Sequence, residues 1–256
     1  MKYVKYLNIL RSIFRRKTST AVLNKIVDRF DKRNSKEAIE QARKWCDMEA
    51  VEITDYLNTF PANILEEANQ FIKELKVREN KVQSSVPFKM GAGGNCMLIY
   101  CLARYRNAKT IVETGVSMGY SSFTFLKVLE ENGGGKLLSS DLPYFDHPDA
   151  EKYIGCIIPD ELKKDWIIYL DGDQANFPRI AKQIGNIDIL NYDSAKSYQS
   201  RVYAWKYFKQ FFKSGTMIMY DDIIDNLHFR DLVLRANLEF KVIKGYTGNY
   251  VGLIFI

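Results

Sequence analysis

The segment TIVETGVSMGYSSF, residues 110–123, decides the fold that we predict for this chain. Its first part, TIVETG, is a short run of apolar and β-branched residues ending in glycine, which is typical of a buried strand. A second glycine follows at Gly119, and from Ser121 onward the apolar residues have the spacing of a helix. A strand, a tight turn and a helix in this order predict a turn where a ligand can approach bare backbone.

The chain after residue 123 continues to alternate between strand and helix. Further strands are expected at KLLSSD (136–141), WIIYLDG (166–172), IDILNYD (187–193) and TMIMYDD (216–222). Short apolar strands separated by helices predict a parallel sheet that is covered on both faces. The end of the chain differs, because LEFKVIKGYTGNYVGLIFI (238–256) holds two apolar runs joined by a turn. This pattern predicts an antiparallel hairpin.

The first 80 residues have another texture. From about residue 20 to residue 80 the apolar spacing is helical, and Ser35 stands where a helix N-cap is expected. We therefore interpret residues 1–80 as a helical extension or cap and residues 81–256 as the main domain. Within the extension, residues 1–17 carry six Lys and Arg residues and no acid on an apolar helical spacing. Such a helix binds an anionic membrane surface, or it packs on its own domain or on a second copy, and we expect a homo-oligomer.

Composition restricts the class of function. With 46% hydrophobic and 27% charged residues, the 256-residue chain is typical of globular proteins. It has no run near the ~20 apolar residues of a membrane-spanning helix, and its four cysteines have no CxxC spacing. We therefore expect a cytoplasmic protein with reduced thiols. The two histidines are too few for a histidine-rich zinc site, and the balanced charge beyond residue 17 disfavours nucleic acid as a substrate.

Acidic residues stand at the ends of the first three predicted strands. Glu113 precedes the turn, where a carboxylate repels a pyrophosphate but favours a cationic amino-acid moiety. Asp141 ends the next strand, where a carboxylate accepts the hydroxyls of a ribose. Beyond the third strand, Asp173 or Gln174 is placed to hydrogen-bond an adenine edge. The candidate cofactor residues are Glu113, Gly115, Ser117, Gly119, Ser121, Ser122, Asp141, Asp173 and Gln174.

The segments VETGVSMGYSS, SSDLP and LDGDQANF resemble the successive cofactor motifs of class I S-adenosylmethionine-dependent methyltransferases. The resemblance covers about residues 85–256. It implies an α/β fold with a Rossmann-like, doubly wound, seven-stranded sheet that ends in an antiparallel hairpin, here preceded by the N-terminal helical extension. It also implies S-adenosylmethionine as the cofactor.

Three further acids follow the fourth and fifth predicted strands. NYDSAKSY and MYDDIIDN place Asp193, Asp221 and Asp222 on neighbouring strand ends. Three unpaired carboxylates repel each other, and a hard divalent cation such as Mg²⁺ relieves that repulsion. The alternative is that Asp221 and Asp222 cap the next segment and that Asp193 pairs with Lys196. The arrangement resembles metal-dependent O-methyltransferases of the catechol type and of the macrolide-sugar and natural-product type, which implies these three aspartates as metal ligands.

Two residues compete for the role of general base. The catechol-type pattern has a lysine three residues after the first ligand, and DSAK supplies Lys196. Beside a metal, the pKa of this lysine would be depressed, so that it takes the hydroxyl proton. Sugar-type relatives often have a histidine in the corresponding stretch, which here reads DSAKSY. His228, six residues past Asp222, is therefore the second candidate, although it is equally compatible with a core position.

The expected function is an S-adenosylmethionine-dependent, Mg²⁺-dependent O-methyltransferase. The stretches DSAKSYQSRVYAW and DDIIDNLHFRD resemble enzymes of bacterial glycan or secondary-metabolite synthesis, so the expected acceptor is a hydroxyl of a sugar, glycoside or polyketide-like small molecule. Catechol-like aromatic acceptors also fit. Two other functions stay open. A nicotinamide-dependent oxidoreductase is disfavoured by the GxxxG spacing and by the hairpin, and a non-catalytic cofactor-binding protein is disfavoured by the intact acids.

Overall fold

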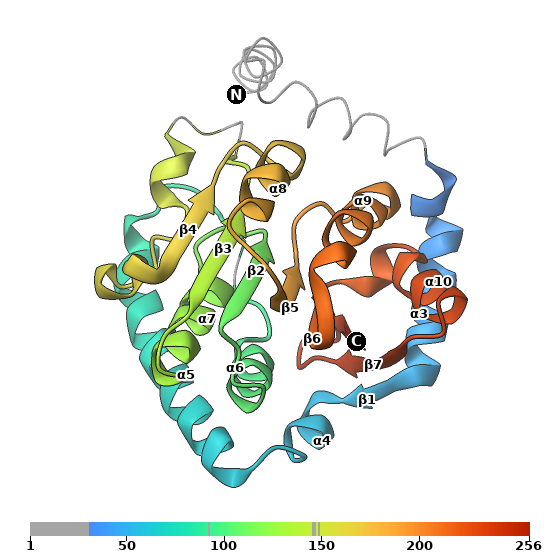
Figure 1. The fold of residues 1–256 in the computed structure, drawn as a ribbon, viewed down its shortest axis with the longest axis horizontal. Helices are drawn as coiled ribbons and strands as arrows, with labels where there is room; N and C mark the ends of the chain where they lie inside the picture. Colours follow the sequence, from blue (N-terminus) through green and yellow to red (C-terminus); the bar gives the residue numbers. More distant parts are fainter. Residues whose placement is uncertain (1–30, 92, 145–146, 148) are drawn as a thin grey trace.

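The computed structural model describes residues 31–91, 93–144, 147 and 149–256, so the basic segment 1–17 lies outside the described residues. The described chain contains one eight-stranded sheet in the order β1-β7-β8-β6-β5-β2-β3-β4 (Figure 1). Strands β2 to β6 pair in parallel, and β8 pairs antiparallel with both β6 and β7. The predicted parallel sheet and terminal hairpin are therefore confirmed. The strands are β1 (Ala50–Glu52), β2 (Thr110–Thr114), β3 (Lys136–Ser140), β4 (Trp166–Tyr169), β5 (Ile187–Tyr192), β6 (Phe212–Tyr220), β7 (Glu239–Lys244) and β8 (Tyr250–Phe255).

Strands β1 and β6 differ most from the expectation. Strand β1 pairs with β7 and adds an eighth strand to the sheet. It lies within residues 20–80, which we expected to be helical throughout. Its three residues are too few to show a strand alternation in the sequence. Strand β6 begins at Phe212 and not at Thr216, with a register shift against β5 between Ile187 and Ile189. Residues 213–215, which lie between the observed and the predicted start of β6, are exposed and are not apolar. They therefore do not show the apolar run by which a buried strand is recognised in a sequence.

Alternating strand residues enter two cores on opposite faces of the sheet. Ile111 and Ile189 belong to the core that contains residues of α4, α5, α6 and α7, whereas Val112 and Leu190 belong to the core with α3, α8, α9 and α10. The sheet is thus covered on both faces, as predicted. The helices are α3 (Lys36–Glu49), α4 (Ile53–Leu57), α5 (Ala62–Val82), α6 (Cys96–Tyr105), α7 (Tyr120–Glu131), α8 (Asp173–Ala181), α9 (Tyr198–Phe208) and α10 (His228–Arg235).

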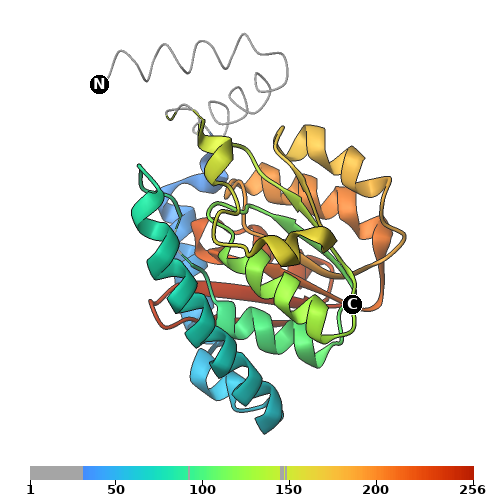
Figure 2. The ribbon, with the colours of Figure 1, turned by 90° about the vertical axis from the view of Figure 1, so that its left-hand side faces the viewer.

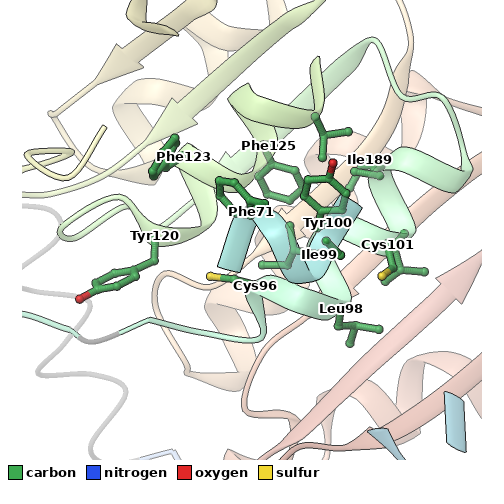
Figure 3. Close-up of a cluster of buried hydrophobic side chains, with 14 of the residues drawn as sticks. Phe71, Cys96, Leu98, Ile99, Tyr100, Cys101, Tyr120, Phe123, Phe125 and Ile189 are labelled. Atoms are coloured by element: carbon green, nitrogen blue, oxygen red, sulfur yellow. The ribbon is translucent and has the colours of Figure 1, made fainter. Parts of the chain in front are cut away.

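The extension is built into these cores. Ser35 caps α3 as expected, because its side chain accepts a hydrogen bond from the amide of Ala38. Helix α5 runs along the outside of α6 and α7 (Figure 2). Its Phe71 stacks on Tyr100 and meets the edge of Phe123, at ring-centroid distances of 5.5 and 5.1 Å (Figure 3). The division of the chain at residue 80 stays a prediction.

None of the helices in the described ranges is long and apolar enough to cross a membrane. Short 3₁₀ helices form parts of the connections between the longer elements. The 3₁₀ helices are η1 (Lys32–Asn34), η2 (Gln83–Ser85), η3 (Ala150–Tyr153), η4 (Asp160–Asp165), η5 (Lys209–Phe211) and η6 (Ile223–Asp225).

Candidate active site

The carboxylate of Glu113 is enclosed at the end of β2. It is fully buried and accepts hydrogen bonds from the hydroxyls of Ser121 (2.5 Å), Ser122 (2.6 Å) and Ser139 (2.9 Å). Burial raises the pKa of Glu113 to about 7, although the three hydroxyls work in the opposite direction. Two of the predicted cofactor residues, Ser121 and Ser122, therefore bond to a third, Glu113, and join β2 to the start of α7.

Gly115 places the turn directly against the end of β5. Its φ is +83°, and an added Cβ would lie 2.4 Å from the carbonyl oxygen of Asp193. The amide of Asp193 in turn donates to the carbonyl of Thr114 at 2.9 Å. Only glycine permits this backbone contact. The predicted cofactor turn and the first of the predicted metal ligands are thus immediate neighbours.

Gly119 has a different role in the turn. Its φ is +96°, and an added Cβ would come within 2.9 Å of the Cα of Gly155. The amide of Gly155 also donates to the carbonyl of Ser117, whose own φ is +52°. The loop before η4 therefore packs tightly on the turn, and this packing explains the second glycine without a ligand.

Asp141 holds the inner side of the turn. Its Oδ2 accepts from the amides of Val116 (3.0 Å) and Ser117 (2.8 Å), and its Oδ1 accepts from the amide of Leu142 (2.6 Å). A carboxylate offers about four acceptor positions, so these bonds leave roughly one for a ribose hydroxyl. Burial raises the pKa of Asp141 in spite of the amide donors.

Asp173 and Asn176 organise the neighbouring strand ends. Asp173 accepts from the hydroxyls of Ser140 (2.7 Å) and Ser194 (2.6 Å), and burial raises its pKa. Gln174 is exposed. The sequence reasoning missed Asn176, which is fully buried and donates to the carbonyl of Tyr169 at 2.8 Å and to Ser140 Oγ at 2.9 Å. The only feature of the sequence that could have pointed to Asn176 is that it is a polar residue on the buried face of α8.

The three predicted metal ligands converge on one point, which is the ammonium group of Lys196. Lys196 Nζ donates to Asp193, lies 3.1 Å from Asp221 Oδ2 and lies 3.2 Å from Asp222 Oδ2. The convergence that we predicted is therefore present, together with the alternative pairing of Asp193 with Lys196. Among the residues that the structure describes, no group of three or more His, Cys, Asp or Glu side chains is arranged to hold a metal ion.

The pKa of Lys196 moves against the role of a base. Burial lowers this pKa, but the carboxylates of Asp193, Asp221 and Asp222 outweigh burial and raise it above its ordinary value. The expectation of a depressed pKa assumed a metal cation beside the amine, whereas the amine here has three anionic neighbours. Burial also raises the pKa of Asp193, although the ammonium group opposes that change.

Arg201 is a second cation of the site that the sequence reasoning did not identify. It is fully buried on α9, and its Nη2 donates to the carbonyls of Asp221 (2.9 Å) and Asp222 (2.8 Å). Asp222 has a φ of +49°, so its backbone is held in the left-handed region. Arg201 therefore fixes the chain that carries two of the three carboxylates.

His228 is a core residue in this structure. It is 3% exposed, its ring lies 5.4 Å from that of Tyr198 and 5.6 Å from that of Tyr220, and burial lowers its pKa to about 3. Tyr198 is also buried, and its hydroxyl donates to Asp231. Of the two candidate bases, Lys196 is the one that contacts the acidic cluster.

One more segment reaches the turn. The amide of Gly91 donates to the hydroxyl of Tyr144 at 3.1 Å, and Ser117 Oγ donates to the carbonyl of Gly91 at 3.3 Å. Gly91 therefore lies beside the predicted cofactor residue Ser117.

Comparison with known proteins agrees with this geometry. A family model described as "Methyltransferase domain" matches residues 112–223, which hold the turn, the strand ends and all three converging aspartates. A search of curated proteins gave no significant match.

Several solved structures share the fold. An O-methyltransferase from Bacillus cereus in complex with SAH has 15% sequence identity and a TM-score of 0.54, over 77% of this chain and 92% of that chain. The O-methyltransferase TomG from Streptomyces achromogenes, involved in tomaymycin synthesis and solved with SAM, has 16% identity and a TM-score of 0.51, over 77% and 90%. A putative caffeoyl-CoA O-methyltransferase from Staphylococcus aureus has 13% identity and a TM-score of 0.54, over 77% and 100%. Residues 112–223 therefore match the model of a methyltransferase domain, and the chain has the fold of these O-methyltransferases.

Proposed function

We propose that this protein transfers the methyl group of S-adenosylmethionine to a hydroxyl of a small molecule. The observation that carries the proposal is the contact of Gly115 with Asp193. It joins the cofactor turn to a cluster of charged side chains, so a methyl donor on the turn and a hydroxyl at the cluster would be neighbours. Holding two reactants in this way supplies much of the rate of a transfer reaction.

The residues around the turn suit a cationic cofactor. Glu113, Asp141 and Asp173 are carboxylates near the ends of three neighbouring strands, and their hydrogen bonds come from hydroxyls and backbone amides. A sulfonium cation is attracted to this acidic edge, whereas a pyrophosphate is repelled. This supports S-adenosylmethionine over a nicotinamide dinucleotide, and the spare acceptor position of Asp141 supports contact with the ribose.

The magnesium ion that the sequence predicts does not fit the arrangement as it stands. Its three ligands would be Asp193, Asp221 and Asp222, but the point that they share is taken by the ammonium group of Lys196. A cation at that point would require Lys196 to move away.

The acceptor proposed from the sequence is a sugar, a glycoside or a polyketide-like small molecule, with catechols as the competing class. A soluble, cytoplasmic enzyme is also proposed, and the four unpaired cysteines of the described chain support a reducing compartment. A homo-oligomer, and attachment through residues 1–17 to a membrane surface or to a second copy, complete the proposal. Light scattering of the full chain and of a variant without residues 1–17, each alone and with anionic vesicles, would test both.

Calorimetry tests the cofactor assignment. S-adenosylhomocysteine should bind the protein and NADH should not, and binding of NADH alone would overturn the proposal. Methyl transfer is then measured with isotopically labelled S-adenosylmethionine against panels of nucleotide sugars, glycosides and catechols. Label that is found on an acceptor oxygen supports the assignment, whereas label on nitrogen or carbon contradicts it.

A further inference from the structure

We propose that Lys196 is the resident cation of this active site and replaces the divalent metal ion that the sequence predicts. Its ammonium group holds the three carboxylates together and stabilises the negative charge that develops on the acceptor oxygen. The inference rests on the proposed function, because it concerns the same hydroxyl. It differs from the sequence-based expectation in the identity of the cation and in the role of Lys196, which is not the base.

The geometry around Lys196 is that of a cation site. The three carboxylates come from two different strand ends, yet each has an oxygen in contact with the same nitrogen atom. The side chain of Lys196 is 28% exposed and that of Asp222 is 40% exposed. The cluster is therefore open to an acceptor on one side, while the backbone that carries the carboxylates is fixed by the protein.

The fixed part of the cluster does not depend on a metal ion. The backbone of Asp193 is tied to Thr114, and the backbones of Asp221 and Asp222 are held by buried Arg201. In metal sites the ion itself usually gathers the ligands against their mutual repulsion. Here the sheet and Arg201 place the carboxylates, and Lys196 offsets part of their charge.

The remaining negative charge suits the reaction. Three carboxylates exceed one ammonium group, and a sulfonium on the adjacent turn brings a further positive charge. In the transfer step a carboxylate of the cluster accepts the hydroxyl proton, the oxygen forms a bond to the methyl carbon, and the sulfur–methyl bond breaks with its electron pair remaining on sulfur. The products are a methyl ether and neutral S-adenosylhomocysteine, and the proton then passes to water. Lys196 donates a hydrogen bond to the oxygen throughout.

Binding of Mn²⁺ tests this inference without an acceptor. The full-length protein saturated with S-adenosylhomocysteine is titrated with Mn²⁺, and free Mn²⁺ is followed by electron paramagnetic resonance. Lys196→Met removes the ammonium group but keeps much of the side-chain length. Lys206→Met, an exposed change on helix α9, which follows Lys196 in the chain, is the matched control. The double variant Lys196→Met with Asp221→Asn locates any new binding.

We expect wild type and Lys206→Met to bind Mn²⁺ weakly, and Lys196→Met to bind it about tenfold more tightly or better, because three carboxylates lose their cation. The double variant should lose that gain. A wild type that binds Mn²⁺ as tightly as Lys196→Met overturns the inference, as does a Lys196→Met protein that gains nothing. If Lys196→Met fails to fold by circular dichroism, Lys196→Gln takes its place in the same comparison. Failure of wild type to bind S-adenosylhomocysteine would instead overturn the proposed function.

Discussion

Replacing Glu113 by Gln should stabilise the cofactor-free protein at alkaline pH while it weakens binding of S-adenosylmethionine. The pKa of Glu113 is about 7 in the folded chain against an ordinary value of 4.5. A raised pKa means that the folded state binds the proton more tightly, so the contribution of Glu113 to stability falls as pH rises from 4.5 to 7. One pKa unit corresponds to about 1.4 kcal/mol, so the loss between pH 5 and pH 8 is about 2 to 3 kcal/mol.

The Glu113→Gln change removes this titration and keeps most of the hydrogen bonds. The new carboxamide oxygen accepts from Ser122 and Ser139, and the amide nitrogen donates to Ser121, whose hydroxyl reverses its direction. Ser139 is the hydroxyl least free to reverse, because its Oγ already accepts from Trp166 Nε1 at 2.9 Å. The exchange therefore removes a buried charge, and of the two amide hydrogens one has a partner in Ser121.

Urea denaturation at pH 5 and pH 8 measures the effect. The difference in unfolding free energy between Glu113→Gln and wild type should become more favourable to the variant by about 2 kcal/mol from pH 5 to pH 8. Glu151→Gln, an exposed change, should show no such trend. Calorimetry should show weaker binding of S-adenosylmethionine to Glu113→Gln, since the acidic edge has lost a charge. A difference independent of pH, or one that favours wild type at pH 8, would refute the reasoning.

Three further changes test the geometry of the site. Gly115→Ala should lower the free energy of unfolding by about 2 kcal/mol or more and abolish binding of S-adenosylhomocysteine, because its Cβ would meet the carbonyl of Asp193. The control Gly185→Ala, whose Cβ would lie in open space, should be nearly neutral in the same urea denaturation and calorimetry. Asn176→Ala should lower the free energy of unfolding by about 2 kcal/mol in urea denaturation, because a fully buried side chain loses its hydrogen bonds to Tyr169 and Ser140. Arg201→Met should cost about 3 kcal/mol in the same assay and should weaken methyl transfer more than cofactor binding, and equal losses in both would contradict its assigned position behind the acidic cluster.

The sequence predicted the parts of this protein whose signals are local. The strand, turn and helix around Gly115 and the paired apolar runs at the end of the chain follow from short patterns, and both are confirmed. Strand β1 was missed because three residues between two helices show no alternation, and it is defined by its pairing with β7. Such pairing joins residues far apart in the chain, Ala50 with Val242 in one case, so no local pattern can indicate it.

The candidate site was predictable to the level of strand ends and no further. The convergence of Asp193, Asp221 and Asp222 follows from the rule that parallel strands end at a common edge. What occupies the point between the three carboxylates depends on the direction of the Lys196 side chain, which the sequence does not show. The role of general base was given to Lys196 only because its spacing from Asp193 resembles the catechol-type pattern. Arg201 gave no signal, because a basic residue on a helix is exposed more often than it is buried under two carbonyl groups.

The acidic residues of the cofactor edge explain how this site can favour a charged methyl donor over its neutral product. Glu113, Asp141 and Asp173 are held by internal hydroxyl and amide donors, so their positions do not depend on a ligand. The charge of Asp141 contributes to raising the pKa of both other residues, which shows that the carboxylates interact unfavourably with one another. A sulfonium relieves that interaction, and the thioether left after transfer does not. Under the proposed function, this repulsion therefore favours binding of the charged methyl donor and release of its neutral product, provided that Gly115 keeps the turn against Asp193.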